Sequence, residues 1–110
     1  EADPSIDAVF ATGPVGAVLA AAAVEELGVE VTIGGVDLST DLLDAIEAGS
    51  VAFTIDQQQY LQGYLPVVML YLNVLNLNTT GGGLPVYTGP GFVTTDNVAD
   101  VKTLVEAGTR

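Results

Sequence analysis

The first half of the chain alternates short apolar runs with longer stretches of helical periodicity. Three runs, residues 6–12, 29–34 and 51–55, are rich in Val, Ile, Phe and Ala, and they predict buried strands. Each run stops close to a Gly, Pro or acidic residue, which limits it to the length of a strand. The apolar residues between the runs recur at helical spacing, so the predicted order is strand, helix, strand, helix, strand.

Two helices connect these strands. Residues 15–27 predict an Ala-rich helix that ends at Gly28, and Ser39 or Thr40 can cap a second helix that ends at Gly49. The expected apolar sides are Val15, Val18, Leu19, Ala22 and Ala23 on the first helix, and Leu42, Leu43 and Ile46 on the second. Short connections of this kind imply parallel strands joined by right-handed crossovers. The predicted fold class is α/β, a parallel, doubly wound sheet with flanking helices.

A long uncharged segment follows, since no charged residue occurs from residue 57 to residue 95. Residues 60–77 predict one long apolar helix with a mild polar stripe. The stripe consists of Gln59, Gln62, Pro66, Asn73 and Asn76. A membrane span is the rival interpretation, because the length approaches the roughly 20 residues that a span needs. The amide side chains and the proline argue against it, so we expect an amphipathic helix.

The remaining residues predict a loop, two short strand-like pieces and a last helix. Residues 79–83 are rich in Gly and Thr and form the loop. Residues 85–87 and 91–93 resemble strands, and they flank Gly89-Pro90. Residues 96–108 predict the final helix, with Val98, Val101, Leu104 and Val105 as its apolar residues.

Composition excludes several functional classes. The 110 residues include 14 acidic and two basic ones, a formal net charge of −12, so the chain repels nucleic acid. This excess serves solubility, or it reflects a source living at high salt. There is no Cys and no His, which excludes disulfides, catalytic triads and His-bearing zinc sites. We therefore expect no catalytic residue, no metal site and no cofactor, and conclude that the chain is not an enzyme.

Polar residues follow each of the three predicted strands. Ligands of open α/β sheets bind beyond the carboxyl ends of the strands, where Thr12-Gly13-Pro14, Asp37 and Gln57 fall. A carboxylate and an amide together suit a ligand rich in hydroxyl groups. The alternatives are that Asp37 caps the helix near Ser39 and that Gln57 is an ordinary loop residue. Asp56 is expected to point away as a solvated or hinge residue. The spacing of Asp37 and Asp56 supports neither a metal site nor a glycosidase pair.

Three segments in this order resemble a known family. They are residues 6–11 (IDAVFA), residues 31–37 (VTIGGVD) and residues 53–64 (FTIDQQQYLQGY), of which the last is the most specific. The series resembles the C-terminal part of sugar-type, ribose-binding-like periplasmic substrate-binding proteins of ABC transporters, from about residue 6 to residue 93. The resemblance implies the type I periplasmic-binding-protein fold, with two lobes, a hinge and a solute in the cleft.

The resemblance also assigns roles to particular residues. Asp37 matches the ligand-binding Asp of the family's Gly-Phe-Asp turn, although Val36 replaces the Phe. Gln57 matches the Gln at the hinge that also touches the ligand. Gly13-Pro14 stands where the family often has Asn-Asp, and this departure removes a typical sugar contact and counts against ribose.

By the same resemblance, residues 1–57 form a βαβαβ unit of the C-terminal lobe. Residues 58–84 form a crossover helix and loop of the other lobe, and residues 85–110 form a returning strand and terminal helix. The implied function is solute binding for import. The alternative is the effector domain of a sugar-responsive LacI-type repressor, which needs a DNA-binding segment upstream.

The implied partners are a small polar solute such as a sugar, the transporter permease, and either the missing N-terminal lobe segment or a second copy of the chain. The implied location is periplasmic or extracellular, with a membrane tether outside this chain.

Overall fold

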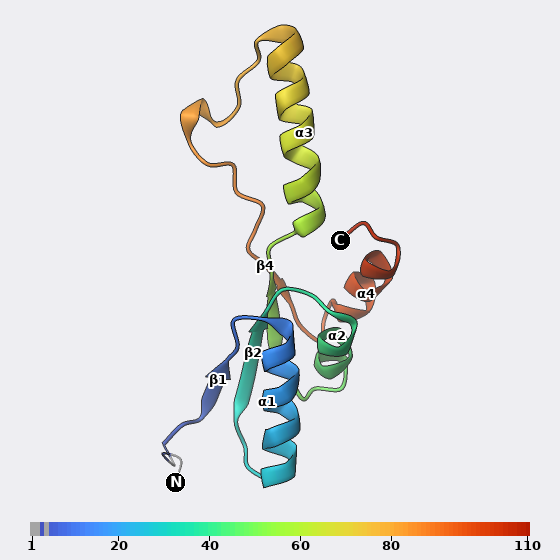
Figure 1. The fold of residues 1–110 in the computed structure, drawn as a ribbon. Coiled ribbons are helices and arrows are strands. Elements are labelled where there is room, and N and C mark those ends of the chain that lie inside the picture. The colour runs from blue at the N-terminus through green and yellow to red at the C-terminus, as the bar shows by residue number, and fades with distance from the viewer. Residues whose placement is uncertain (1–2, 4) are drawn as a thin grey trace.

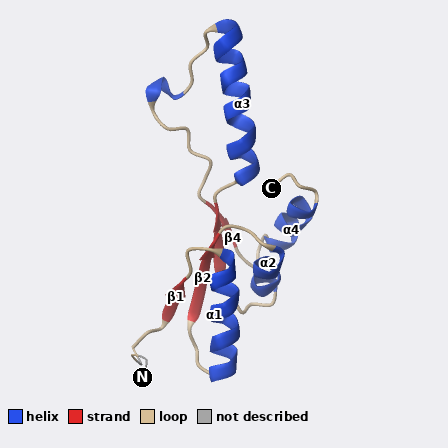
Figure 2. Ribbon diagram, in the orientation of Figure 1, coloured by secondary structure: helices blue, strands red, loops and turns tan. Residues whose placement is uncertain are grey.

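The computed structural model describes residue 3 and residues 5–110. Along the chain these residues form β1 (Ala8–Phe10), α1 (Pro14–Leu27), β2 (Thr32–Val36), α2 (Thr40–Glu47), β3 (Phe53–Asp56), α3 (Gln59–Asn76), a 3₁₀ turn (Gly81–Gly83), β4 (Gly91–Val93) and α4 (Val98–Glu106). Figure 1 follows this order by colour, and Figure 2 separates helices from strands.

The four strands form one sheet in the order β1-β2-β3-β4. β1 pairs with β2, and β2 with β3, both in parallel, which confirms the predicted arrangement of the first three strands. β4 pairs antiparallel with β3, so the sheet is mostly rather than wholly parallel. The reason is that the chain leaves the sheet through α3 and returns from the same side (Figure 1).

Two predicted strands were misplaced. The second was expected at residues 29–34 but spans Thr32–Val36, because β1 begins at Ala8 and pairs with β2 from Thr32 onward. Both glycines of β2 lie inside the strand, and each leaves room for a neighbour. A Cβ on Gly34 would lie 2.6 Å from the ring of Phe53. Residues 85–87 form no strand, since no strand lies beside them to accept pairing.

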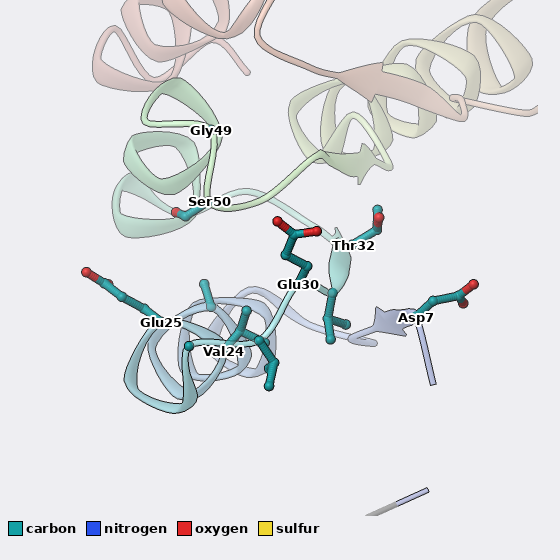
Figure 3. A pocket seen from close by; sticks show the side chains of 11 residues that line it. Asp7, Val24, Glu25, Glu30, Thr32, Gly49 and Ser50 are labelled. Atoms are coloured by element: carbon teal, nitrogen blue, oxygen red, sulfur yellow. The ribbon is translucent and has the colours of Figure 1, made fainter. Parts of the chain in front are cut away.

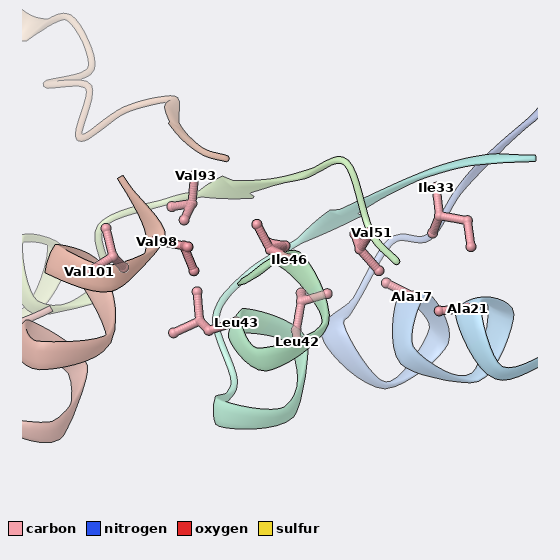
Figure 4. Close-up of a cluster of buried hydrophobic side chains, with 10 residues drawn as sticks. All are labelled: Ala17, Ala21, Ile33, Leu42, Leu43, Ile46, Val51, Val93, Val98 and Val101. Carbon is pink, nitrogen blue, oxygen red and sulfur yellow. The ribbon is translucent and has the colours of Figure 1, made fainter. Parts of the chain in front are cut away.

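One cluster of buried side chains joins the helices to the sheet (Figure 4). The prediction for α2 is confirmed, because Leu42, Leu43 and Ile46 are fully buried. The predicted apolar side of α1 is largely wrong: Val18 packs partly against the core, but Val15 and Leu19 are 70% and 64% exposed, and Ala22 and Ala23 are exposed too. Ala17 and Ala21 face the core instead. These small side chains let α1 approach β2 closely, since a Cβ on Gly35 would lie 3.1 Å from that of Ala17.

The prediction for the final helix, α4, is confirmed for two of its four apolar residues. In α4, Val98 and Val101 are buried, as predicted. Leu104 is 42% exposed, however, and Val105 packs only partly against the core. The buried residues of α4 are thus those of its first half, and the helix packs against α2.

The predicted α/β sheet with flanking helices is confirmed, but the described helices that pack on it do so on one face, so these residues contain one helical layer of the doubly wound pattern. Side chains alternate along strands, so Ile33, Thr54 and Val93 point into the helical core. On the opposite face Phe53 lies between Phe10 and Phe92, with ring centroids 6.2 and 5.8 Å apart. Two crossovers in the same direction along β1-β2-β3 place both connecting helices on the same face.

α3 stands away from the sheet. It extends from the end of β3 into solvent, and the molecule is accordingly elongated, with extents of 60 × 30 × 20 Å (Figure 1). The predicted helix is confirmed, although α3 spans Gln59–Asn76, and none of its residues is buried. In the described part of the chain, no helix combines the length and apolarity that crossing a membrane requires.

Candidate functional site

Three connections leave the same edge of the sheet. β1, β2 and β3 run parallel, so the residues that follow them gather at the carboxyl edge. Thr12, Gly13 and Pro14 follow β1, Asp37 follows β2, and Gln57 follows β3. In Figure 1 this edge lies where α3 meets the sheet.

Asp37 is held in an unusual backbone conformation. Its φ is +69°, a region that side chains other than Gly enter at a cost. Two contacts to β3 fix it: the N–H of Asp37 donates to the carbonyl of Ile55 at 2.8 Å, and its own carbonyl accepts from Thr54 Oγ1 at 2.8 Å. The helix-cap alternative does not apply, because Ser39 caps α2 by accepting from the N–H of Leu42. The conformation turns the Asp37 side chain toward the end of β3.

The structure brings Asp37 and Gln57 into contact. Gln57 Nε2 donates to Asp37 Oδ1 at 2.5 Å, and Gln59 Nε2 donates to the same oxygen at 3.0 Å. The second carboxylate oxygen of Asp37, Oδ2, accepts no hydrogen bond from the described residues. The sequence pattern did not single out Gln59, because it lies inside the predicted polar stripe of the long helix. The result is a cluster of one carboxylate and two amides.

The residues that follow β1, Thr12, Gly13 and Pro14, lie at the same edge of the sheet as this cluster because β1 runs parallel to β2 and β3. Among the described residues, no hydrogen bond joins them to Asp37 or Gln57. Gly13 precedes α1 as its N-cap and supplies no side-chain cap, and Pro14 is the first residue of the helix. Some N–H groups in the first turn of α1 are therefore left without a capping side chain.

Asp56 points away from this cluster, but it is buried rather than solvated. Its side chain is 0% exposed, and its Oδ2 pairs with Nε of Arg110 at 2.6 Å. Its Oδ1 accepts the N–H of Gln58 at 2.7 Å, which holds Gln58 at a φ of +61°. Arg110 was not foreseen from the sequence, although a buried carboxylate in a chain with two basic residues has few possible partners.

Two segments link α3 to the sheet, and they contact each other. The outgoing segment carries Gln57, whose carbonyl accepts from Gln62 Nε2 and from Thr88 Oγ1, each at 3.0 Å. Thr88 belongs to the returning segment, which precedes β4. A small hollow at this crossing is lined by Ile55, Gln57, Gln62, Tyr87, Thr88, Gly89 and Pro90. The crossing thus borders the Asp37–Gln57 cluster.

Both basic residues are engaged elsewhere. Arg110 pairs with Asp56, and Lys102 Nζ lies 2.7 Å from Asp44 Oδ1 and 2.5 Å from Glu47 Oε2. The hydrogen bond to Asp44, and then that to Glu47, raises the pKa of Lys102 above its usual value. Neither of these ion pairs involves Asp37, although the Arg110–Asp56 pair lies at the same carboxyl edge, at the end of β3.

A second hollow lies at the opposite, amino edge of the sheet (Figure 3). Three carboxylates border it, those of Asp7, Glu25 and Glu30, while Thr32 and Ser50 contribute hydroxyl groups. In the described residues no group of three or more His, Cys, Asp or Glu side chains is placed to hold a metal ion. The carboxyl edge offers both donors and acceptors, which makes it the better site for a neutral polar ligand.

An open, mostly parallel sheet with polar residues beyond its carboxyl ends is the arrangement of α/β proteins that bind small ligands at that edge. Residues 1–76 match the family described as periplasmic binding protein domain. The chain belongs to this family, which consists of solute-binding proteins rather than enzymes and implies a location outside the cytoplasm.

Individual relatives agree with this assignment. The chain is 39% identical over 71 residues to the xylose/arabinose-binding protein XylF of Sulfolobus acidocaldarius, covering 64% of this chain and 17% of that protein. A carbohydrate transporter from Acidothermus cellulolyticus 11B, solved with myo-inositol, is 44% identical with a TM-score of 0.84, covering 98% of this chain and 38% of that one. The arabinose-binding protein AraP of Geobacillus stearothermophilus is 33% identical with a TM-score of 0.73. The match covers 88% of this chain and 36% of AraP.

Proposed function

We propose that the carboxyl edge of the sheet binds a neutral, hydroxyl-rich solute, a sugar or a sugar-like polyol, for import by an ABC transporter. The observation that carries the proposal is the cluster in which Gln57 and Gln59 both donate to Asp37 Oδ1 and leave Oδ2 without a donor from the chain. Thr12, Gly13 and Pro14 complete the proposed contact surface at the end of β1.

The remaining hydrogen-bonding capacity of this cluster suits hydroxyl groups. Asp37 Oδ2 can accept from solute hydroxyls, and each glutamine retains one N–H to donate and a carbonyl to accept. A hydroxyl both donates and accepts, so adjacent hydroxyls of a polyol can pair with the acceptor on Asp37 and with the donors and acceptors on the two glutamines. An anionic sugar would meet the carboxylate of Asp37, with which neither Lys102 nor Arg110 forms an ion pair.

The names of relatives support the same class of solute. The Acidothermus structure holds myo-inositol, and a carbohydrate transporter binding protein from Agrobacterium radiobacter, 27% identical, holds D-arabinose. The Sulfolobus relative is named for xylose and arabinose. Because this chain spans 17% of the curated relative and 38% of the Acidothermus chain, its own solute is proposed from the residues of the edge.

We assign the two units of the molecule to different lobes. Residues 1–57 and 85–110 form the sheet unit of the C-terminal lobe. Residues 58–84 form the α3 unit, which extends into the other lobe and is joined to the sheet unit by the outgoing segment at Gln57 and the returning segment at Thr88. In the transporter the solute then lies between the lobes, and the permease receives it. A membrane tether outside this chain completes the arrangement.

The uncovered side of α3 needs a partner under this proposal. Large apolar residues such as Leu70, Val74 and Leu75 are 60–76% exposed, and such surfaces favour association. The partner is either the missing N-terminal lobe segment or a second copy. Size-exclusion chromatography with light scattering should show the 110-residue chain self-associating, whereas a compact, stable monomer would count against the proposal.

A thermal-shift screen of the full-length gene product that contains this chain tests the solute class. Neutral aldoses and inositols should raise the melting temperature, while a uronic acid or sugar phosphate should not. Asp37→Ala should abolish the shift, and Asp96→Ala, which removes an exposed loop carboxylate, should preserve it. A shift that survives Asp37→Ala, or one given by anionic sugars alone, would contradict the proposal.

A further inference from the structure

Gln59 makes a contact that its position in the chain does not require. It lies in the first turn of α3, the helix that stands away from the sheet, yet its amide reaches back to Asp37 at the end of β2. The two residues are 22 positions apart in sequence. The other polar side chains of α3 with hydrogen bonds, Gln62 and Asn73, bond only to carbonyls five residues away in the segments next to α3.

The contact joins the two units of the molecule. Asp37 is anchored to the sheet, because its backbone is bonded to Ile55 and Thr54 of β3. Gln59 is anchored to α3, whose start is set by Gln58 and the buried carboxylate of Asp56. A hydrogen bond between these two anchored residues therefore depends on the angle at which α3 leaves the sheet.

We propose that Gln59 is a positioning residue of the solute site: its amide fixes the Asp37 carboxylate, directs Oδ2 to the solute and ties the α3 unit to the sheet unit. Gln57 and Gln59 both donate to the same oxygen of Asp37, so two hydrogen bonds restrain the rotation of the carboxylate. This inference rests on the proposed function, since it gives Gln59 a role at the same site.

Fixing the carboxylate before binding strengthens the site. A carboxylate that rotates freely loses that freedom when a solute orders it, and a pre-oriented one avoids this loss. The solute need not displace Gln59, because it uses Oδ2 while Gln59 uses Oδ1. The Gln59–Asp37 bond therefore persists in the bound state, and removing it weakens binding without removing a contact to the solute.

Solute affinity of the full-length gene product, measured by isothermal titration calorimetry with myo-inositol and L-arabinose, tests the role. Gln59→Met keeps the length of the side chain but has no donor, and it should raise Kd about two- to tenfold, the effect of having to order one freely rotating side chain on binding. Gln59→Glu places a second carboxylate against Asp37 and should raise Kd further. Asn76→Asp, the matched change at the far end of α3, should leave Kd unchanged.

The NMR resonance of the Gln59 side-chain amide tests its contact with Asp37 directly. It needs no solute, so it is independent of the proposed function, and the Asn76 amide serves as a control for general loosening of the fold. In the ligand-free protein, the side-chain amide resonance of Gln59 should move in Asp37→Ala, while that of Asn76 should not.

If Gln59→Met and Gln59→Glu bind like the wild type while Asp37→Ala does not bind, the inference is overturned and the proposed function stands. If the wild type binds neither solute, the proposed function fails for them. The amide resonance then decides the inference: a Gln59 signal unmoved by Asp37→Ala overturns it, and a moved signal supports it.

Discussion

Both the sheet unit and the α3 unit are rich in hydrophobic residues, but only the sheet unit buries them in a core. Ten hydrophobic residues form the core of the sheet unit, from Ala17 in α1 to Val101 in α4 (Figure 4). α3 is longer than any other helix and has no buried residue. The difference shows that apolar periodicity specifies a helix, whereas burial depends on whether a second surface is present to cover it.

The polar contacts of the sheet unit and the α3 unit also differ in burial. The sheet unit contains the fully buried Asp56 with its partner Arg110. The side-chain hydrogen bonds of α3 are exposed and mostly local, except for the one from Gln59 to Asp37. The proposed site therefore lies where the well-packed sheet unit meets a unit that is held by few contacts, which is the arrangement expected at a hinge.

The largest expected effect is loss of core packing in the sheet unit. Ile46→Ala should lower the free energy of unfolding by about 2–5 kcal/mol, because Ile46 is fully buried and its removal leaves a cavity. The matched substitution Leu75→Ala in α3 should change it by less than about 0.5 kcal/mol, since Leu75 is largely exposed. Urea unfolding of both variants measures this, and equal effects would contradict the difference in burial.

A smaller effect is expected from the ion pair at the crossing. Arg110→Met should lower the free energy of unfolding by about 1–3 kcal/mol, because it leaves the buried Asp56 carboxylate without its charged partner. The guanidinium side is partly exposed, so the loss stays below that of a fully buried pair. Asp56→Asn in the Arg110→Met background should recover part of it. No recovery in urea unfolding would show that charge is not the cause.

The smallest effect is expected at the surface ion pairs between α2 and α4. Lys102→Met removes the contacts to Asp44 and Glu47, and its destabilisation should be smaller than that of Arg110→Met and should shrink in 1 M salt.

The folded state raises the pKa of Lys102, chiefly through Asp44. The stabilisation is therefore constant below the pKa of an unfolded lysine, about 10.4, and is lost as the pH rises above it. The melting temperatures of the wild type and of Lys102→Met, measured from pH 7 to 11, test this pH dependence. The difference between them should shrink above about pH 10, and a difference that grows there would contradict the prediction.

Sequence patterns were sufficient for the order of the first three strands and two helices and for the parallel pairing of those strands. The helix ends at Gly28 and Ser39 follow from capping chemistry, and the parallel order of β1 to β3 follows from short connections. The side of α1 that packs on the sheet could not be predicted. It depends on Gly35, whose missing side chain lets Ala17 approach, and this contact links residues far apart in sequence.

For the candidate site, the sequence predicted that Asp37 and Gln57 lie together, and the structure brings them into contact. Gln59 was missed because its role depends on where α3 leaves the sheet. Arg110 was missed because it lies 54 residues from Asp56. Neither arrangement has a local sequence signal. The family resemblance supplied what periodicity could not, the role of Asp37 as a proposed solute contact.

Hydrogen–deuterium exchange of the full-length gene product, with and without a saturating neutral polyol, tests most directly which edge of the sheet binds. We predict slower exchange of backbone amides in residues 10–14, 36–39 and 57–60, which follow β1, β2 and β3. Amides of residues 24–32, around the acidic hollow at the other edge (Figure 3), should exchange at unchanged rates. Protection confined to residues 24–32, with residues 36–39 unaffected, would contradict the account.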